Sequence, residues 1–354
     1  MNGASPEIND GMIPVIVEND GNTKKADLYS KWYSYNEKKW ANMVLVTNES
    51  RESYKNATPG TIIESSDIIG YFVWIPRYKY KIPTSGTNIP SEINIIFEDK
   101  FTKKSLGNAK TEYLTAPGFT FGTEELNGVW IGKFETTGTE SLPTVLPNFS
   151  QLIRQNNNNK FISSKIFNNY VEDSDAHMIK NSEWSAVTYL SHSKFGINNK
   201  VSANLYTKNK TGCGPNNTTS CEPQFGNNTD NYPQSTTGNI TGIFDMSGGL
   251  WEAVMGNLNN IISNSGFSNM PDPKYYDLYT STLYEEACNG NPCLGHALFE
   301  TNKWYLNGYL SLSNDYPWIH RGGYHSHEQS AGLFTVNRFS GSDYQYYAFR
   351  VAIN

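Results

Sequence analysis

The sequence predicts an α+β fold of short, mostly antiparallel strands, two early helices and long irregular loops, preceded by a small β module. Three observations predict it. Of the 354 residues, 37% are hydrophobic and only 18% charged, while 14% are aromatic. Short apolar runs alternate with tracts of Gly, Asn and Pro, which favour turns and loops. Helical periodicity occurs in few places, and the chain contains no internal repeat.

Residues 1–62 predict the small β module. The segments GMIPVIV, NDGNTKKADL and KWYSYNEKKWANMVLV follow the order strand, turn, strand, turn, strand. Tyr33, Tyr35 and Trp40 flank the polar turn of the third segment. We interpret this module as a spacer that precedes the main domain, residues 63–354.

The main domain opens with two expected core strands and a short helix. GYFVWIPRYKYKI, from Gly70, is continuously apolar and then alternates, as a core strand does where it reaches a sheet edge. GVWIGKFETTG (Gly128–Gly138) predicts a second such strand. LPNFSQLIRQNN predicts a short helix that is capped by Asn148 or Ser150 and ended by the following Asn tract.

A second helix is expected in HMIKNSEWSAVTYLSHSKFG. Asn181 can cap it, Glu183 lies in its first turn and Gly196 can end it. The residues expected to face the core are Trp184, Val187 and Leu190. Beyond this helix, GIFDMSGGLWEAVMGN predicts a turn that leads into an apolar strand between two loop-rich stretches.

Four cysteines lie in those loop-rich stretches as two close pairs, Cys213 with Cys221 and Cys288 with Cys293. Neither pair has the CxxC spacing typical of zinc sites. The spacing favours two local disulfides, with free thiols as the alternative. Disulfides would place the protein in an oxidising compartment.

Charge and hydropathy exclude two classes of partner. The net charge is −6, and no block of Lys and Arg stands out, so a nucleic-acid partner is excluded. No segment approaches the roughly 20 apolar residues that span a membrane, so direct membrane insertion is not expected. The first apolar run is broken by Pro14 and does not resemble a signal peptide. The chain is therefore expected to be cytosolic or an ectodomain, and the cysteines favour the ectodomain.

Three motifs carry a resemblance to a known family. EWSAVTYL, GIFDMSGGLWEAV and RGG…AFRVAI occur in the order found in the formylglycine-generating enzyme branch of the C-type lectin fold. The resemblance covers roughly residues 68–354 and implies that fold. The oxidases of this branch need redox cysteines near the chain end, whereas residues 294–354 contain none. Gly249 and Ala253 also replace the Asn and Trp of the family turn, so we expect no enzyme.

Within this branch the chain more closely resembles the variable proteins of diversity-generating retroelements, whose C-terminal codons are rewritten at adenines. The resemblance implies a surface-displayed, adhesin-like ligand-binding protein with a variable region at about residues 318–350. The opening segment is similar to pilin-like surface proteins. Expected locations are extracellular, on the cell surface or a pilus, or on a phage virion. The expected partner is a protein or glycan on another cell or phage target.

The variable region divides into a frame and intervals. The glycines of the frame allow a left-handed backbone, and Arg350 is expected to be buried and paired with a carboxylate or with carbonyl groups. The frame residues are Arg321, Gly322, Gly323, Phe334, Phe349 and Arg350. The interval residues, predicted to bind ligand, are His320, Tyr324, His325, Ser326, His327, Glu328, Gln329, Thr335, Val336, Asn337, Arg338, Phe339, Ser342, Asp343, Tyr344, Gln345, Tyr346 and Tyr347.

The intervals have neither helical nor strand period, and they are rich in residue types that dominate binding surfaces. We therefore expect their side chains to face outward and to be interchangeable. Most can be reached from an Asn codon by changes at its adenines; Glu328, Gln329 and Gln345 cannot. An ordinary aromatic surface loop is the alternative interpretation.

Signals for metals and for other functions are weaker. The irregular spacing of His320, His325 and His327 does not predict zinc. Asp245 and Glu252 stand where the oxidase branch has oxygen ligands to a structural Ca²⁺, so they are either a calcium site or simply hydrogen-bonded. No cofactor is required. The alternative functions are an oxidase-like enzyme on the same fold and a structural pilus or fibre subunit.

Overall fold

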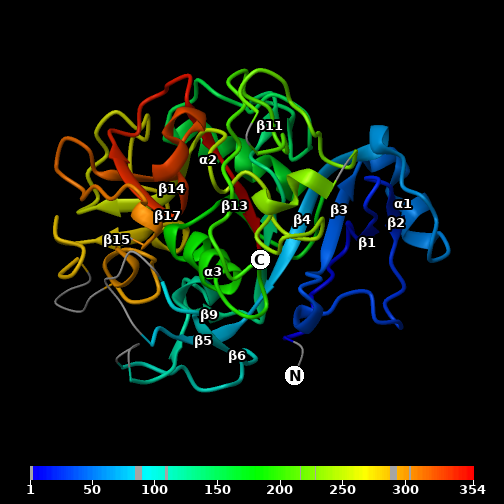
Figure 1. Ribbon diagram of the computed structural model, residues 1–354, viewed down its shortest axis with the longest axis horizontal. Helices are drawn as coiled ribbons and strands as arrows, with labels where there is room; N and C mark the ends of the chain where they lie inside the picture. The colour runs from blue at the N-terminus through cyan, green and yellow to red at the C-terminus, as the bar shows by residue number, and fades with distance from the viewer. Residues whose placement is uncertain are drawn as a thin grey trace.

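The computed structural model of the protein is mixed α+β, with short and mostly antiparallel strands around few helices (Figure 1). It describes residues 3–83, 90–107, 111–215, 217–227, 229–287, 293–302 and 304–354, apart from the side chain of Gln329.

The main sheet has seven strands, and each neighbouring pair in it is antiparallel. The last strand of the chain lies inside this sheet rather than at its edge. Its three residues are all apolar and all buried, as is typical of a central strand. In spatial order the strands are β13 (Ala176–Met178), β19 (Val351–Ile353), β10 (Gly128–Gly132), β4 (Ile68–Pro76), β3 (Asn42–Val46), β1 (Met12–Val17) and β2 (Thr23–Lys25).

The N-terminal residues belong to this same sheet. Residues 1–62 are β-rich, as predicted, but β3 pairs with β4 from Asn42 to Val46, and every residue of β3 is buried. In Figure 1 the blue strands β1 to β3 accordingly continue the sheet beyond β4. Residues 1–62 therefore extend the main sheet rather than form a separate spacer, because a strand that is buried at every residue, as β3 is, needs both of its faces covered. Helix α1 (Asn48–Asn56) follows β3 and was not predicted.

The C-terminal tract builds most of a second sheet. Its five strands are β15 (Asp277–Tyr279), β14 (Trp251–Leu258), β16 (Trp318–Gly322), β17 (Gly332–Phe339) and β18 (Tyr347–Phe349). Strand β14 is the predicted GLWEAV strand, and it pairs with β16 in antiparallel and with β18 in parallel orientation. Arg350 alone separates β18 from β19, so the chain passes at this residue from the second sheet to the main sheet.

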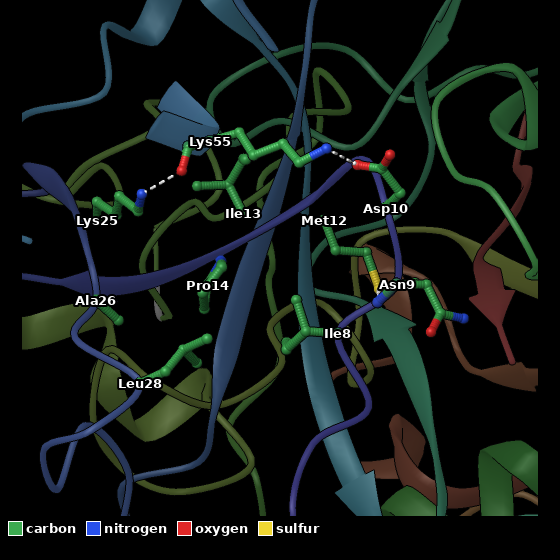
Figure 2. A pocket seen from close by; sticks show the side chains of 10 residues that line it. All are labelled: Ile8, Asn9, Asp10, Met12, Ile13, Pro14, Lys25, Ala26, Leu28 and Lys55. Atoms are coloured by element: carbon green, nitrogen blue, oxygen red, sulfur yellow. Dashed lines mark hydrogen bonds and ion pairs between the residues drawn. The ribbon is translucent and has the colours of Figure 1, made fainter. Parts of the chain in front are cut away.

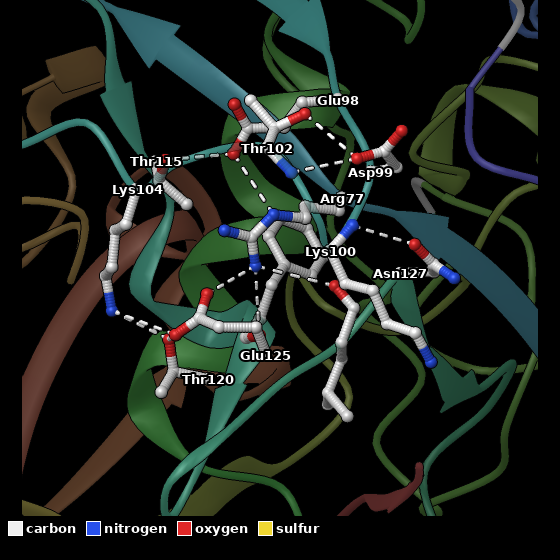
Figure 3. A network of polar contacts seen from close by, with 12 residues as sticks. Arg77, Glu98, Asp99, Lys100, Thr102, Lys104, Thr115, Thr120, Glu125 and Asn127 are labelled. Atoms are coloured by element: carbon white, nitrogen blue, oxygen red, sulfur yellow. Dashed lines mark hydrogen bonds and ion pairs between the residues drawn. The ribbon is translucent and has the colours of Figure 1, made fainter.

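The predicted strand from Gly70 is divided in two. Strand β4 ends at Pro76, which lacks an N–H donor, and β5 (Tyr78–Lys81) starts a separate three-stranded sheet with β6 (Asn94–Phe97) and β7 (Leu114–Thr115). Between them the buried guanidinium of Arg77 makes ion pairs of 3.1 Å with Glu98 and 2.6 Å with Glu125 (Figure 3). The other short strands are β8 (Thr120–Phe121), β9 (Glu124–Glu125), β11 (Thr137–Gly138) and β12 (Pro143–Thr144).

The first predicted helix is displaced along the chain. Helix α2 runs from Asn157 to Lys165, and the Oδ1 of Asn156 accepts a hydrogen bond of 3.0 Å from the backbone N–H of Asn159. The expectation of a cap at Asn148 or Ser150 was therefore wrong. The Asn tract begins this helix rather than ending it, since Asn is a favourable N-cap residue.

The second predicted helix is confirmed as α3 (Asn181–Ser191), which is buried along its whole length, including Trp184. Its N-cap is Lys180, whose backbone N–H donates to Glu183 at 2.8 Å, so Asn181 is its first residue and not its cap. The helix ends before Gly196. The 3-10 segments are Tyr35–Glu37, Ser65–Asp67, Pro117–Phe119, Ile166–Asn169, Thr229–Gln234, Pro273–Tyr275, Phe299–Thr301, Trp304–Leu306 and η9 (His325–Ser330).

The disulfide between Cys213 and Cys221 is confirmed. Cys293 is also disulfide-bonded, and its predicted partner Cys288 lies outside the described residues. Within the described ranges no helix is long and apolar enough to cross a membrane.

Candidate functional site

The frame residues hold the backbone beneath the C-terminal tract. Arg321 and Phe349 are fully buried, and Gly322 and Gly323 have φ angles of +83° and +79°. A Cβ atom at Gly323 would lie 2.9 Å from the Cα of Ala331, so this position requires glycine. The turn after β16 is thereby fixed by backbone geometry rather than by its exposed side chains.

Arg350 joins several elements in the interior, as the sequence predicted. Its Nε and Nη2 donate to the two carboxylate oxygens of Glu252 at 3.0 and 2.6 Å. Its Nη1 donates to the carbonyl of Gly132 at 2.8 Å and its Nη2 to that of Phe244 at 3.0 Å. The side chain therefore ties β14 to β10 and to the turn before β14.

Three carboxylates are buried around this arginine, and protein donors already occupy them. Burial raises the pKa of Glu252 to about 7 and that of Asp245 to about 6, and it raises the pKa of Glu135 well above its ordinary value. Asp245 accepts hydrogen bonds from the Asn204 amide at 3.0 Å and from the Gly212 N–H at 2.8 Å. In the described part of the chain, no three His, Cys, Asp or Glu side chains are grouped to hold a metal ion. Asp245 and Glu252 are thus both hydrogen-bonded to protein groups.

The interval residues differ in exposure. Those that are exposed are Ser326, Glu328, Asp343 and Tyr344. Those that are half-buried are Tyr324, His327, Asn337, Arg338, Ser342, Gln345, Tyr346 and Tyr347. Those that are buried are His320, His325, Thr335, Val336 and Phe339.

The expectation that all interval side chains face outward was therefore wrong for the buried five. The interval at residues 335–339 has no strand period in sequence, yet it continues β17 and pairs with β16, where Phe339 lies opposite Trp318. His320 lies within β16 itself. Pairing and burial on the second sheet outweigh the irregular pattern of the sequence.

Four half-buried or exposed tyrosines form one patch, which we call the tyrosine surface: Tyr324, Tyr344, Tyr346 and Tyr347. The rings of Tyr324 and Tyr346 are stacked with centroids 5.3 Å apart. Tyr344 lies 5.4 Å from Tyr346 and 5.3 Å from Tyr347. Residues from two intervals that β17 separates in sequence thus meet in space.

A layer of buried rings supports the tyrosine surface. His320 is stacked between Trp251, at 4.3 Å, and Phe339, at 4.9 Å. Trp251 also contacts His327, with ring centroids 5.1 Å apart. Burial lowers the pKa of His320, His325 and His327, so the imidazoles are neutral aromatic rings at physiological pH.

Two arginines, one outside the C-terminal tract and one within it, make contacts at this face of the protein. The exposed Arg154 donates to Gln345 at 3.2 Å, and its backbone N–H donates to the carbonyl of Tyr344. Arg338 stacks over Tyr316 at 5.5 Å. The sequence predicted neither Arg154 nor Trp251 at this surface. The GLW motif could have indicated Trp251, whereas no sequence signal marks Arg154.

A pocket elsewhere on the protein does not share these features. It has a volume of about 430 Å³ and lies beside β1 in the N-terminal part of the main sheet (Figure 2). Its apolar lining includes Ile8, Met12 and Leu28. At its rim Lys55 pairs with Asp10 at 2.7 Å, so these two charges satisfy each other. Nothing in this pocket indicates a ligand.

No protein-family model matches the chain, and no curated protein sequence matches it. Several solved structures are similar to it. Treponema denticola variable protein 1 has 10% identity and a TM-score of 0.33, with 80% of this chain and 95% of that chain covered. The Major Tropism Determinant I1 and M1 variants each have 9% identity, with TM-scores of 0.34 and 0.35, and 99% of this chain and 85% of theirs covered. TM-scores below 0.5 do not establish a shared fold, so we infer the function below from the residues.

Proposed function

We propose that this chain is a surface-displayed ligand-binding protein whose C-terminal tract is diversified by a retroelement. The observation that carries the proposal is the tyrosine surface, in which Tyr324 from one interval meets Tyr344, Tyr346 and Tyr347 from another. The motifs of the sequence add the expected fold, the C-type lectin fold of the formylglycine-generating enzyme branch. Display is on a cell, a pilus or a phage virion.

The physical basis of binding is non-covalent contact by rings on a fixed backbone. Tyrosine offers a large contact area with few rotatable bonds, so little conformational entropy is lost when it binds. The left-handed glycines and the buried Arg350 hold the backbone of the tract before any ligand arrives, which lowers the cost of ordering. The proposed ligand is a protein or glycan on another cell or on a phage target.

Exposure divides the interval positions into two groups. Exposed and half-buried positions such as Ser326 and Tyr344 can change side chain without disturbing the core. Buried positions such as Val336 and Phe339 are constrained by packing. Diversification is therefore proposed to act mainly through the exposed and half-buried positions.

Two other functions make different predictions. An oxidase-like enzyme on the same fold needs redox cysteines close to the chain end, and the sequence has none in residues 294–354. We therefore propose no enzymatic activity. A structural fibre subunit would self-associate through the tyrosine surface, which sedimentation of the isolated chain would reveal.

Diversification is tested at the level of DNA. The 3′ end of the gene is sequenced deeply in a population of the source organism, together with the DNA downstream. We expect a near-copy of the final segment, beside a reverse transcriptase gene, and differences between individuals at adenine-derived positions of the intervals. Uniform sequences and no near-copy would reject diversification.

Ligand binding is tested on whole cells. The fluorescently labelled chain is incubated with a panel of bacterial strains, and binding is measured by flow cytometry. Replacing Tyr324, Tyr344 and Tyr346 together by Ser should abolish binding to any strain that the parent chain binds. Tyr29→Ser is the matched control, because Tyr29 is fully exposed and lies in the N-terminal part of the chain. Equal loss in the control, or no loss in the triple variant, would contradict the proposed surface.

A further inference from the structure

A lysine lies buried directly beneath the tyrosine surface. Lys160 belongs to α2 and has no exposed surface, and its Nζ has no hydrogen-bond partner among the described residues. The ammonium group lies over two rings of the tract, 5.4 Å from the centroid of Phe339 and 5.6 Å from that of Tyr347. These rings stabilise the cation through their faces but supply no hydrogen bond.

Other buried polar atoms of the same helix end are also unpartnered. The amide of Asn157 makes no hydrogen bond through either Oδ1 or Nδ2, and the residue has no exposed surface. Asn157 and Lys160 are three residues apart in α2 and so project from one side of the helix. The Oε1 of Gln155, which is 2% exposed, is unpartnered as well. Buried groups of this kind normally bind a protein group, a water or a ligand.

The tract closes over this helix end. The backbone N–H of Asn157 donates to the carbonyl of Gly341 at 3.0 Å, and that of Arg154 donates to Tyr344. Phe339 is 2% exposed whereas Tyr347 is half-buried, so of the two rings that Lys160 contacts, Tyr347 is the one that reaches solvent.

The charges that act on Lys160 are few. Burial lowers its pKa to about 7, and the exposed carboxylate of Asp343 partly opposes that shift. His320 contacts the same two rings and is neutral. None of the ion pairs in the described part of the chain involves Lys160. An anion placed beside Nζ would therefore gain both a hydrogen bond and an ion pair that the lysine now lacks.

We propose that Lys160 is a concealed anion subsite beneath the tyrosine surface, capped by Tyr347 and Phe339 in this sequence and opened when residue 347 is small. The subsite would take a carboxylate or a similar small anion of the ligand. The inference rests on the proposed function, because it treats residue 347 as a position whose side chain changes. A fixed lysine beneath one changeable ring, that of residue 347, would give the same fold either an aromatic or a cationic surface.

The test uses the full chain, with Tyr347→Ser as the opened variant and acetate as the probe. Thermal unfolding is measured with 100 mM acetate and with chloride at the same ionic strength. Acetate should raise the melting temperature of Tyr347→Ser by at least about 1 °C. It should not raise that of the parent chain or of Tyr347→Ser combined with Lys160→Met, which keeps the volume of the side chain and removes its charge. Tyr316→Ser is the control for loss of a ring on a neighbouring part of the surface.

A second readout is the reactivity of the amine. Brief acetylation with acetic anhydride at pH 7.5, followed by peptide mass spectrometry, should modify Lys160 at least about tenfold faster in Tyr347→Ser than in the parent chain, since burial blocks the reagent. The rate at Lys165 serves as the internal reference.

The outcomes separate the two proposals. Equal acetate effects with and without Lys160, or equal labelling of Lys160 in parent and variant, would overturn the subsite and leave the proposed function intact. If Tyr347→Ser does not unfold cooperatively, Tyr347→Thr replaces it, because a β-branched residue suits the first position of β18. Failure of both variants to fold would show that residue 347 is not interchangeable, which counts against the subsite and the proposed function together.

Discussion

Replacement of Arg350 by Met tests whether the frame depends on one buried ion pair. The guanidinium and the carboxylate of Glu252 are both fully buried, and each of the carboxylate oxygens accepts one of its N–H groups. Removing one partner of a buried pair leaves an uncompensated charge and typically costs about 3–5 kcal/mol. In Arg350→Met the Glu252 carboxylate would lose the cation that lowers its pKa and would keep the nearby charge of Asp245, which raises it.

The expected shift follows from the size of the chain. An unfolding entropy of about 2.1 cal/mol/K per residue gives roughly 0.7 kcal/mol/K for 354 residues that unfold together. The melting temperature of Arg350→Met should therefore fall by about 4–7 °C in differential scanning calorimetry. Arg154→Met is the control, because Arg154 is exposed, and its melting temperature should change by less than about 1 °C.

A second substitution identifies the cause of the loss. Adding Glu252→Gln to Arg350→Met removes the unpaired charge and should recover part of the lost stability. Two results would refute the reasoning. One is a decrease of the melting temperature by less than about 2 °C in Arg350→Met. The other is a double variant no more stable than the single one, which would show that packing and not charge is responsible.

Three further predictions concern pH, backbone and exposure. Burial raises the pKa of Glu300 to about 7, so its protonated form stabilises the fold below about pH 4.5, and this contribution is lost as the pH rises to 7. The melting temperature of the parent should therefore exceed that of Glu300→Gln by less at pH 8 than at pH 5. A constant difference between the two would contradict this prediction. Gly323→Ala should cost about 1–3 kcal/mol in chemical denaturation because of its positive φ. Gly308→Ala should cost less than about 0.5 kcal/mol, because the φ of Gly308 is ordinary and an added Cβ would make only van der Waals contacts there; similar costs would reject backbone strain. In urea unfolding, Tyr344→Ser should change stability by less than about 1 kcal/mol, whereas Val336→Ala, in the core, should cost about 2–3 kcal/mol. The reverse order would reject the division of the interval residues into exposed and buried positions.

The sequence predicted features that depend on local chemistry. Helix α3, strand β14, the disulfide of Cys213 with Cys221 and the pairing of Arg350 each follow from a few adjacent residues with distinct chemistry. The left-handed turn at Gly322 follows from the RGG motif in the same way. Such features are predictable because capping, strand burial and φ are decided within a few residues.

The features that the sequence did not predict depend on partners far along the chain. The start of α2 was placed too early, because Asn148, Ser150 and Asn156 are all favourable cap residues and the helix uses Asn156. The joining of residues 1–62 to the main sheet depends on pairing between β3 and β4, which no local pattern encodes. Lys160 and Arg154 reach the candidate site only because α2 packs beneath the tract.

The buried intervals limit the proposed variation. Val336 lies opposite Arg321, a frame residue, on the strand next to it, so a change there disturbs the same β-ladder that fixes the turn. Phe339 and His320 stack on each other, so a change in one removes a contact of the other. Tyr344 and Ser326, by contrast, are exposed. If selection for folding acts on a diversified population, variants at residues 336 and 339 should be depleted relative to those at 326 and 344, although the same codon chemistry reaches all four. That depletion would show that burial in the second sheet restricts variation, because mutation at adenines alone would change the four positions without regard to burial.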